Sequence, residues 1–241
     1  MLQNRKINAV IVGGSGAIGS EFINILLKDY DINKIYAFSR QKQEFNSDKI
    51  IEAKIDLENE ESIENASKII EEKIDLIIIA TGILHNENIM PEKSLREIDS
   101  VKFLKILQIN TIGPALIAKY FIPKLNKNEE SIFAAISARV GSISDNKLGG
   151  WYSYRASKSA LNMVLKNLAI ELKRTNKLAK VIGLHPGTVN SNLSKPFQAS
   201  VAKEKLFSPF YSAHKLLDVI NQSKAEDSGK IFDFNNIEIK P

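Results

Sequence analysis

The stretch Asn8-Ala9-Val10-Ile11-Val12-Gly13-Gly14-Ser15-Gly16-Ala17-Ile18-Gly19 joins a short apolar run to the beginning of a helical pattern. Small residues let backbone amides come close to a phosphate group, and the N-terminus of a following helix supplies oriented N–H donors and positive potential. Gly13 suits the tight turn, and Gly19 lets the helix pack close to the strand. An ordinary strand–helix connection is the alternative. The stretch predicts a phosphate-binding turn for a dinucleotide, formed by Gly13, Ser15, Gly16, Ala17, Ile18 and Gly19.

Around this turn, apolar β-branched runs alternate with longer segments of helical periodicity. Near-continuous apolar runs suit strands that are covered on both faces, as in a parallel sheet. The predicted strands are Asn8–Val12, Lys34–Phe38, Ile50–Ile55, Asp75–Ile79, Ser131–Ile136, Lys180–Leu184 and Lys230–Phe234. The predicted helices are Ile18–Lys28, Glu60–Glu72, Leu95–Leu125 with an interruption at Gly113-Pro114, Tyr152–Arg174 and His214–Asn221.

This alternation predicts an α/β fold, a Rossmann-type doubly wound parallel sheet with helices on both faces and right-handed crossovers. A length of 241 residues is ordinary for one such domain, and no repeat or linker divides residues 1–241. The stretch 187–209 is rich in Ser, Asn, Pro and Lys. We expect it to be a long loop, with room for a short helix, that covers the site as a lid.

Composition excludes several classes of site. The chain has no cysteine, which rules out a disulfide scaffold, a thiolate metal site and a cysteine nucleophile. Its three histidines are far apart and show no ligand spacing, so we expect no metal. The net charge of +5 is mild and spread along the chain, which argues against nucleic-acid binding. The apolar run Ile7–Val12 is too short for a signal peptide or a membrane span, so we expect a cytoplasmic protein with no membrane partner.

The end of the second predicted strand, Ala37-Phe38-Ser39-Arg40, bears on the choice of cofactor. An acidic residue near this position would bond the ribose 2′-hydroxyl of NAD, whereas an arginine attracts the 2′-phosphate of NADP. Ser39 and Arg40 therefore favour NADP(H) over NAD(H), with a plain surface arginine as the alternative. Asp56, which precedes Leu57 after the third strand, is placed either to bond the adenine amino group or to cap the next segment.

Tyr154 and Lys158 lie four residues apart in the predicted helix Tyr152–Arg174, so both side chains share one face. A free phenol with a pKa of about 10 is a poor base at neutral pH. A neighbouring ammonium group stabilises the phenolate and makes tyrosine a usable acid or base. The spacing alone is common by chance on helices, so it gains meaning only from its context.

Taken in order, these features resemble the short-chain dehydrogenase/reductase family over essentially the whole chain. The matching elements are Gly13–Gly19, Asp56, Asn110 within Gln108–Pro114, the Ser137 segment, Tyr154 with Lys158, and Pro186–Ser191. More narrowly, Ser137–Asn146, Gly149–Lys158 and the ending Gly229–Phe234 resemble the C-factor-like branch, which is named for a bacterial cell-contact signal.

The resemblance implies a role for each matching residue. Tyr154 would donate a proton to the carbonyl oxygen as hydride arrives from the nicotinamide. Lys158 would lower the pKa of Tyr154 and bond the nicotinamide ribose. Asn110 would kink its helix and hold a water of the proton relay. The segment Pro186–Ser191 would wrap the nicotinamide, with contacts from Pro186, Gly187, Val189 and Ser191.

Two departures from the family pattern stand out. Where the family usually has Asn-Asn-Ala-Gly, this chain has Ile79-Ala80-Thr81-Gly82, and we expect Ala80, Thr81 and Gly82 still to admit the adenosine half of the cofactor. The family also places a substrate-orienting serine three residues before a glycine, but three residues before Gly141 lies Ala138. Either a bulge turns Ser137 inward, or Ser142 replaces the serine, or the site lacks that hydroxyl.

The sequence thus predicts an NADP(H)-dependent enzyme that interconverts a carbonyl and an alcohol on a small molecule, with Tyr154, Lys158, Asn110 and Ser137 as catalytic residues. The alternative is an NADP(H)-binding signalling or regulatory protein in which turnover is secondary. Trp151 and Tyr152 are candidates to line the substrate pocket or to pack. We expect a homodimer or homotetramer through the apolar helices Leu95–Leu125 and Tyr152–Arg174, as is usual for the family.

Overall fold

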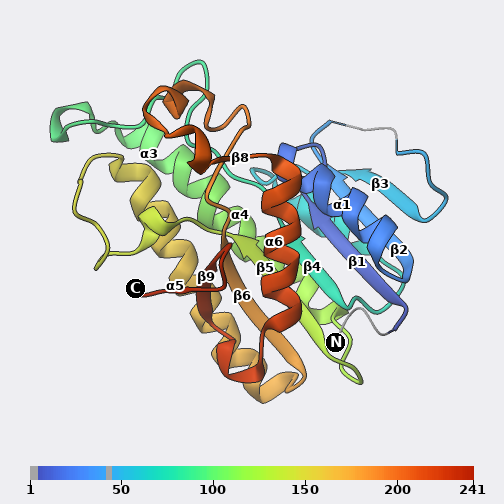
Figure 1. Cartoon of the computed structure of the whole chain (residues 1–241). Coiled ribbons are helices and arrows are strands. Elements are labelled where there is room, and N and C mark those ends of the chain that lie inside the picture. The colour runs from blue at the N-terminus through green and yellow to red at the C-terminus, as the bar shows by residue number, and fades with distance from the viewer. Residues whose placement is uncertain (1–4, 42–44) are drawn as a thin grey trace.

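The computed structural model describes residues 5–41 and 45–241, and its centre is a twisted, mostly parallel sheet (Figure 1). The sheet has the order β10-β9-β6-β5-β4-β1-β2-β3, in which only the edge strand β10 runs antiparallel. Its strands are β1 (Ile7–Val12), β2 (Ile32–Ser39), β3 (Ile50–Lys54), β4 (Leu76–Ile79), β5 (Ser131–Ile136), β6 (Ala179–His185), β9 (Lys230–Asp233) and β10 (Glu238–Ile239). The strand order reverses between β1 and β4, and ligands bind at such a switch point in open α/β sheets.

Helices cover both faces of the sheet, which confirms the predicted doubly wound architecture. On one face α1 packs against α6, and this layer contains Phe22, Ile23, Leu216 and Ile220. On the other face α2, α4 and α5 cover the strands, and α4 and α5 can be followed in Figure 1. The helices are α1 (Ala17–Asp29), α2 (Glu60–Lys68), α3 (Ser100–Leu107), α4 (Gly113–Phe121), α5 (Tyr152–Thr175) and α6 (Pro209–Gln222).

Two predicted helix boundaries differ from the structure for local reasons. α2 ends at Lys68 rather than at Glu72, because the amides of Ile69 and Ile70 bond three residues back and tighten the last turn. α6 begins at Pro209 rather than at His214. Ser208 caps this helix by accepting a hydrogen bond from the Tyr211 amide, and Pro209 occupies the first turn, where its missing N–H costs nothing.

The long helical pattern Leu95–Leu125 contains three kinds of helix: α, π and, at its two ends, 3-10 turns over Leu95–Glu97 and Ile122–Lys124. α3 passes into a π-helical segment, Gln108–Ile112, which continues directly into α4. The expected interruption at Gly113-Pro114 is thus a change of hydrogen bonding rather than a break, since the Gly113 amide bonds to the Gln108 carbonyl five residues earlier.

Among the described helices, the continuous run Ser100–Lys124 has the length and hydropathy of a membrane-span candidate. Ile106, Ile117 and Phe121 from this run are fully buried within the protein. Part of the apolar surface of this run is therefore buried in the core of the protein.

The predicted lid, 187–209, contains more regular structure than expected. Two short strands, β7 (Thr188–Val189) and β8 (Leu206–Phe207), pair in parallel, and 3-10 turns lie at Lys195–Ser200 and Lys203–Lys205. Gly187 has a φ of +73°, and a Cβ at this position would lie 2.6 Å from the Phe207 ring. Glycine therefore lets the chain turn out of β6 and bring the segment back over the sheet edge.

Candidate active site

A cleft of about 1010 Å³ opens at the carboxyl edge of the sheet, beside the β1/β4 switch point. It brings together nearly all of the site residues predicted from the sequence, although they come from seven separate segments. The predicted residues along its wall are Gly13, Ser15, Gly16, Ala17, Ile18, Ser39, Arg40, Asp56, Leu57, Ala80, Thr81, Gly82, Ser137, Tyr154, Lys158, Pro186, Gly187, Val189 and Ser191. Gly19 and Asn110 are buried and do not line the cleft.

The glycine turn between β1 and α1 is tight. Gly13 has a φ of +94°, its amide bonds to the Phe38 carbonyl, and its carbonyl accepts from the Gly16 amide. A Cβ on Gly19 would lie 2.1 Å from the Gly13 carbonyl oxygen, so only glycine allows this approach. Gly16 caps α1 without a side-chain hydrogen bond, which leaves the first amides of the helix directed toward the cleft.

The rim beside β2 carries the residues expected to select the cofactor. Arg40 is exposed on the cleft wall, and the Ser39 hydroxyl donates to the Gln41 carbonyl. Asp56 also lines the cleft, where its carboxylate accepts from the Glu58 amide in the turn before α2. Asn59, rather than Asp56, is the N-cap of α2, so Asp56 shapes the approach to the helix without capping it.

Tyr154 and Lys158 both reach the cleft from the first two turns of α5, and both are buried. The Lys158 Nζ lies 5.9 Å from the centre of the Tyr154 ring and donates to the Ile136 carbonyl at 2.9 Å. Burial raises the pKa of Tyr154 to about 12 and lowers the pKa of Lys158 to about 8. Desolvation of both groups therefore outweighs the expected lowering of the tyrosine pKa by the lysine, and Tyr154 holds its proton at neutral pH.

Asn110 lies in the π-helical segment and is fully buried. Its Oδ1 accepts from the Ile83 amide, and its Nδ2 donates to the Ile83 carbonyl and to the Ser157 hydroxyl. The side chain thus ties the segment after β4 to α5, with no N–H left over. Any water that Asn110 holds would have to donate to the second lone pair of Oδ1 or to the main-chain carbonyl.

The substrate-orienting hydroxyl expected from the family is committed elsewhere or missing. Ser137 touches the cleft, but its hydroxyl donates to Asn162 on α5 at 2.6 Å. Ser142 is buried outside the cleft wall, and its hydroxyl accepts from the Asp145 amide. Ala138 lies on the wall itself and offers only a methyl group. Of the three alternatives left by the sequence, the geometry favours a site without that hydroxyl.

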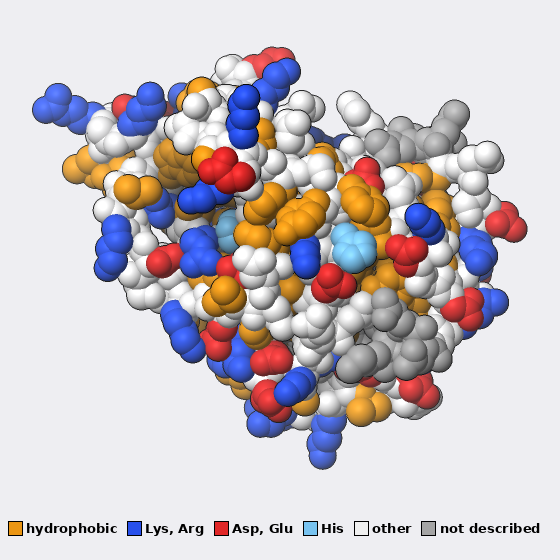
Figure 2. Space-filling model, viewed as in Figure 1, with side chains coloured by type: hydrophobic (Ala, Val, Ile, Leu, Met, Phe, Trp, Pro, Cys, Tyr) orange, Lys and Arg blue, Asp and Glu red, His pale blue; other side chains and the backbone are white. Residues whose placement is uncertain are grey.

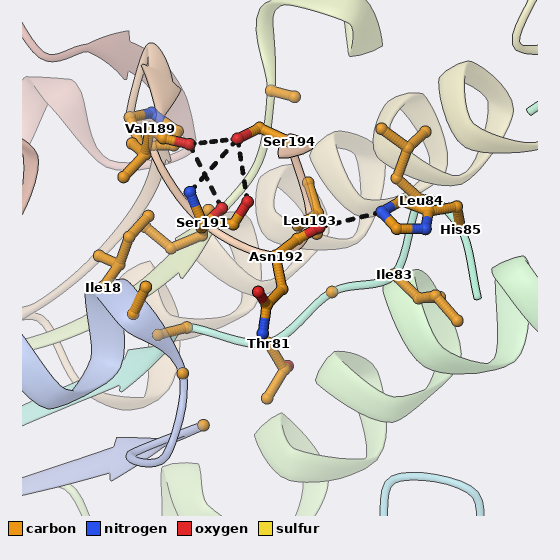
Figure 3. A pocket seen from close by; sticks show the side chains of 18 of the residues that line it. Ile18, Thr81, Ile83, Leu84, His85, Val189, Ser191, Asn192, Leu193 and Ser194 are labelled. Carbon is orange, nitrogen blue, oxygen red and sulfur yellow. Dashed lines mark hydrogen bonds between the residues drawn. The ribbon is translucent and has the colours of Figure 1, made fainter. Parts of the chain in front are cut away.

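The segment predicted as a lid lines the cleft, and its own serines fix its local shape (Figure 3). The Ser194 hydroxyl donates to the Val189 carbonyl and accepts from the Ser191 amide and from Gln198. On the opposite side the His85 imidazole bonds the Asn192 carbonyl at 3.0 Å, which links the lid to the segment after β4 (Figure 3).

An aromatic wall stands above Tyr154. Trp151 lies edge-on to the Tyr154 ring with centroids 6.1 Å apart, and it packs against Phe197 of the lid at 5.1 Å. Trp151 therefore lines the pocket, whereas Tyr152 is exposed and lies off the cleft wall. Sequence reasoning did not single out Phe197 or His85, because no local motif marks residues that meet only when the lid folds back.

The family and the fold are identified by comparison with known proteins. Residues 7–202 match the family model described as short chain dehydrogenase. The chain is 30% identical to the C-signal of Myxococcus xanthus over 146 residues, which is 61% of this chain and 82% of that protein. It is also 30% identical over 180 residues to 1-hydroxy-2-glutathionyl-2-methyl-3-butene dehydrogenase of Rhodococcus sp. (strain AD45), covering 75% of each chain.

Solved structures share the fold at lower identity. The carbonyl reductase Sniffer of D. melanogaster superposes with a TM-score of 0.86 at 21% identity, over 98% of this chain and all of that one. The NADPH-bound carbonyl reductase from chicken fatty liver gives a TM-score of 0.85 at 19% identity, with the same coverage. Together with the cleft, the match to the family model identifies this chain as a member of the short-chain dehydrogenase/reductase family of oxidoreductases, in its C-factor-like branch.

Proposed function

We propose that this protein is an NADP(H)-dependent reductase that interconverts a carbonyl and an alcohol group on a small molecule. The observation that carries the proposal is the placement of Tyr154 and Lys158 on the wall of the same cleft that begins at the Gly13 turn. Solved relatives with this fold include NADPH- and NADP-bound proteins, which agrees with the choice of cofactor argued from Arg40.

The residues along the cleft fit an NADP(H) molecule. The uncapped N-terminus of α1 offers amides to the pyrophosphate, and the exposed Arg40 offers a cation to the 2′-phosphate. The segment Pro186–Ser191 stands where it can cover the nicotinamide end. When bound, the cofactor supplies the hydride.

Residues of the chain would then donate the proton and stabilise the charge that develops on the carbonyl oxygen. Because Tyr154 keeps its proton at neutral pH, its O–H can donate to the substrate oxygen as negative charge develops there. Lys158, held by the Ile136 carbonyl, stands close enough to stabilise the phenolate that remains. Trp151 and Phe197 shield this oxygen from water on the lid side.

Loss of NADPH absorbance across a panel of aldehydes, ketones and quinones tests the proposal, with NADH in parallel. Tyr154→Phe should lower kcat/KM by about 10²–10⁴-fold while NADPH still binds, because only the proton donor is removed. The matched control is Tyr152→Phe, which lies off the cleft wall and should retain wild-type rates. Tight NADPH binding without turnover of any carbonyl would refute the enzymatic proposal.

The second candidate is a signalling or regulatory protein that binds NADP(H), and the similarity to the C-signal of Myxococcus xanthus motivates it. A genetic test separates the two functions. If cells carrying Tyr154→Phe show the same phenotype as wild type while a deletion strain does not, turnover is not the biological role. A cytoplasmic location and a homodimeric or homotetrameric state stay predictions.

Charge on the face that Figure 2 shows does not form the basic stripe expected of a nucleic-acid partner. On the face shown in Figure 2, Lys and Arg side chains are interspersed with Asp and Glu. Such mixing gives weak phosphate attraction compared with a basic stripe. We therefore propose a small molecule as the partner.

A further inference from the structure

His185 is the last residue of β6 and lines the same cleft as Ala138, the position without the substrate-orienting hydroxyl. The Ser137 amide bonds to the Leu184 carbonyl, so the β5–β6 pairing continues to the strand ends and sets His185 beside Ser137, the residue before Ala138. On the other side, His185 pairs with Asp233 of β9. Its half-buried side chain lines the cleft.

The imidazole is not fully used by the protein. Across the described residues, four buried side-chain atoms lack a hydrogen-bond partner, namely Thr81 Oγ1, Asn176 Oδ1, His185 Nδ1 and Asn221 Oδ1. Only Thr81 and His185 of these four line the cleft. Thr81 contacts the Gly13 turn, in the half of the cleft assigned to the cofactor. His185 is the one of these two that lies beside Ser137. Its Nδ1 is enclosed, so a substrate in the cleft would have to bond the other ring nitrogen, Nε2.

The surroundings of His185 keep it neutral. Burial and the nearby Arg139 lower its pKa to about 4, although Asp233 opposes them. Arg139 itself is paired with Asp233 and Asp145. A neutral imidazole offers one N–H donor and one acceptor nitrogen, which can serve a carbonyl or hydroxyl oxygen.

We propose that His185 positions the substrate by a hydrogen bond to the oxygen that Tyr154 protonates, in place of the hydroxyl that Ala138 lacks. The inference rests on the proposed function and names a further residue of that same site. A carbonyl oxygen has two lone pairs, so it can accept from the tyrosine and from the imidazole together. The second donor fixes the angle at which the carbonyl meets the hydride and stabilises developing charge.

A double-mutant cycle tests this role with the best carbonyl substrate from the panel. His185→Leu should lower kcat/KM by about 10–100-fold, as expected for the loss of one oriented donor, while the Kd for NADPH stays unchanged. Adding Ala138→Ser to that variant should recover at least about tenfold, because the hydroxyl returns on the cleft wall just after β5. In the wild-type background the same serine should change little.

The controls separate positioning from folding. His214→Leu removes an exposed histidine of α6 that lies off the cleft wall, and it should leave kinetics unchanged. The Tm of each variant is measured, and His185→Gln, which keeps an N–H donor, should retain more activity than His185→Leu. Equal kcat/KM for His185→Leu and wild type, or the same effect of Ala138→Ser in both backgrounds, would overturn the inference.

A readout without turnover distinguishes failure of the inference from failure of the proposed function. The chain has three histidines, so its imidazole proton NMR signals can be assigned with single variants. Saturating NADP+ and 4-nitrobenzaldehyde form a complex that cannot react, and we expect the His185 signal to shift while that of His214 does not. An unmoved His185 signal in a protein that does reduce carbonyls overturns the inference alone. A protein that reduces none of the panel refutes the proposed function, and the His185 signal still decides whether the imidazole contacts the aldehyde.

Discussion

Replacing Lys158 by methionine should make the protein more stable while it destroys activity. Lys158 is 2% exposed, and burial lowers its pKa from 10.5 to about 8. At about 1.4 kcal/mol per pKa unit, keeping this ammonium charged inside the fold at neutral pH costs about 3 kcal/mol. Methionine has a similar length and no charge, so it removes this cost.

The gain is partly offset by a lost hydrogen bond. The Lys158 Nζ donates to the Ile136 carbonyl at 2.9 Å, and a bond of this kind contributes about 1–1.5 kcal/mol. The net expectation for Lys158→Met at pH 7 is a stabilisation of about 2 kcal/mol, or a rise in Tm of roughly 4–8 °C.

The pH dependence of this difference has a definite sign. The folded pKa lies below the unfolded value, so between about pH 8 and pH 10.5 the unfolded chain holds a proton that the folded chain has released. Wild type therefore gains stability as the pH rises through this window, and the variant does not. The difference in free energy of unfolding between Lys158→Met and wild type should be about 2 kcal/mol at pH 7 and near zero by about pH 9.5.

Urea denaturation of both proteins at the two pH values, without cofactor, measures the effect. Lys180→Met is the matched control, because the buried Lys180 ammonium pairs with Glu130 and donates to the Ser223 carbonyl. Lys180→Met should be destabilised, since Glu130 and the Ser223 carbonyl lose the ammonium group that they bind. A Lys158→Met protein that is no more stable than wild type, or whose advantage is the same at both pH values, would refute the reasoning.

Three further predictions concern the cofactor and the proton. Gly19→Ala should cost about 1–3 kcal/mol of stability and weaken NADPH binding at least tenfold, because its Cβ would collide with the Gly13 carbonyl; unchanged values in denaturation and fluorescence titration would contradict this. Arg40→Asp should raise the Kd for NADPH by about 10–100-fold and improve NADH binding, and an unchanged ratio of the two Kd values would show that Arg40 does not select the cofactor. Because the pKa of Tyr154 is raised to about 12, carbonyl reduction should stay level from pH 6 to pH 9 while alcohol oxidation, which needs the phenolate, rises with pH; parallel profiles would argue against Tyr154 as the acid.

Most of the fold could be predicted from the sequence, because each helix and strand has its own local signal. The apolar runs of β1, β4 and β5 are too short and continuous for amphipathic helices, and the glycine turn after β1 fixes where the first crossover begins. The start of α6 was misplaced by five residues although Ser208-Pro209 is a good helix start. The surrounding Ser- and Pro-rich composition favoured a loop and concealed that cap.

The site was predictable only as far as contiguous motifs describe it. Tyr154 and Lys158 could be paired from their spacing, but the burial that sets their pKa values depends on how the lid and the sheet edge enclose them. The free Nδ1 of His185 depends on which atoms of β5 and β9 face it, and no spacing in the sequence encodes that. The hydrogen bond from the Ser137 hydroxyl to Asn162 likewise joins residues 25 positions apart, which no local motif predicts.

The π-helical segment makes the number of residues in this helix as important as their identity. A π turn accommodates one more residue than an α turn, and one residue corresponds to about 100° of rotation around the axis. If one residue were deleted between Gln108 and Ile112, the turn could close with α-helical hydrogen bonds while α3 and α4 kept their present faces toward the core. The side chains inside the turn would change direction instead, which would displace Asn110 from Ile83 or Thr111 from the Ser157 carbonyl. A deletion variant should therefore keep the packing of Ile106 but lose the hydrogen bonds that tie the segment after β4 to α5.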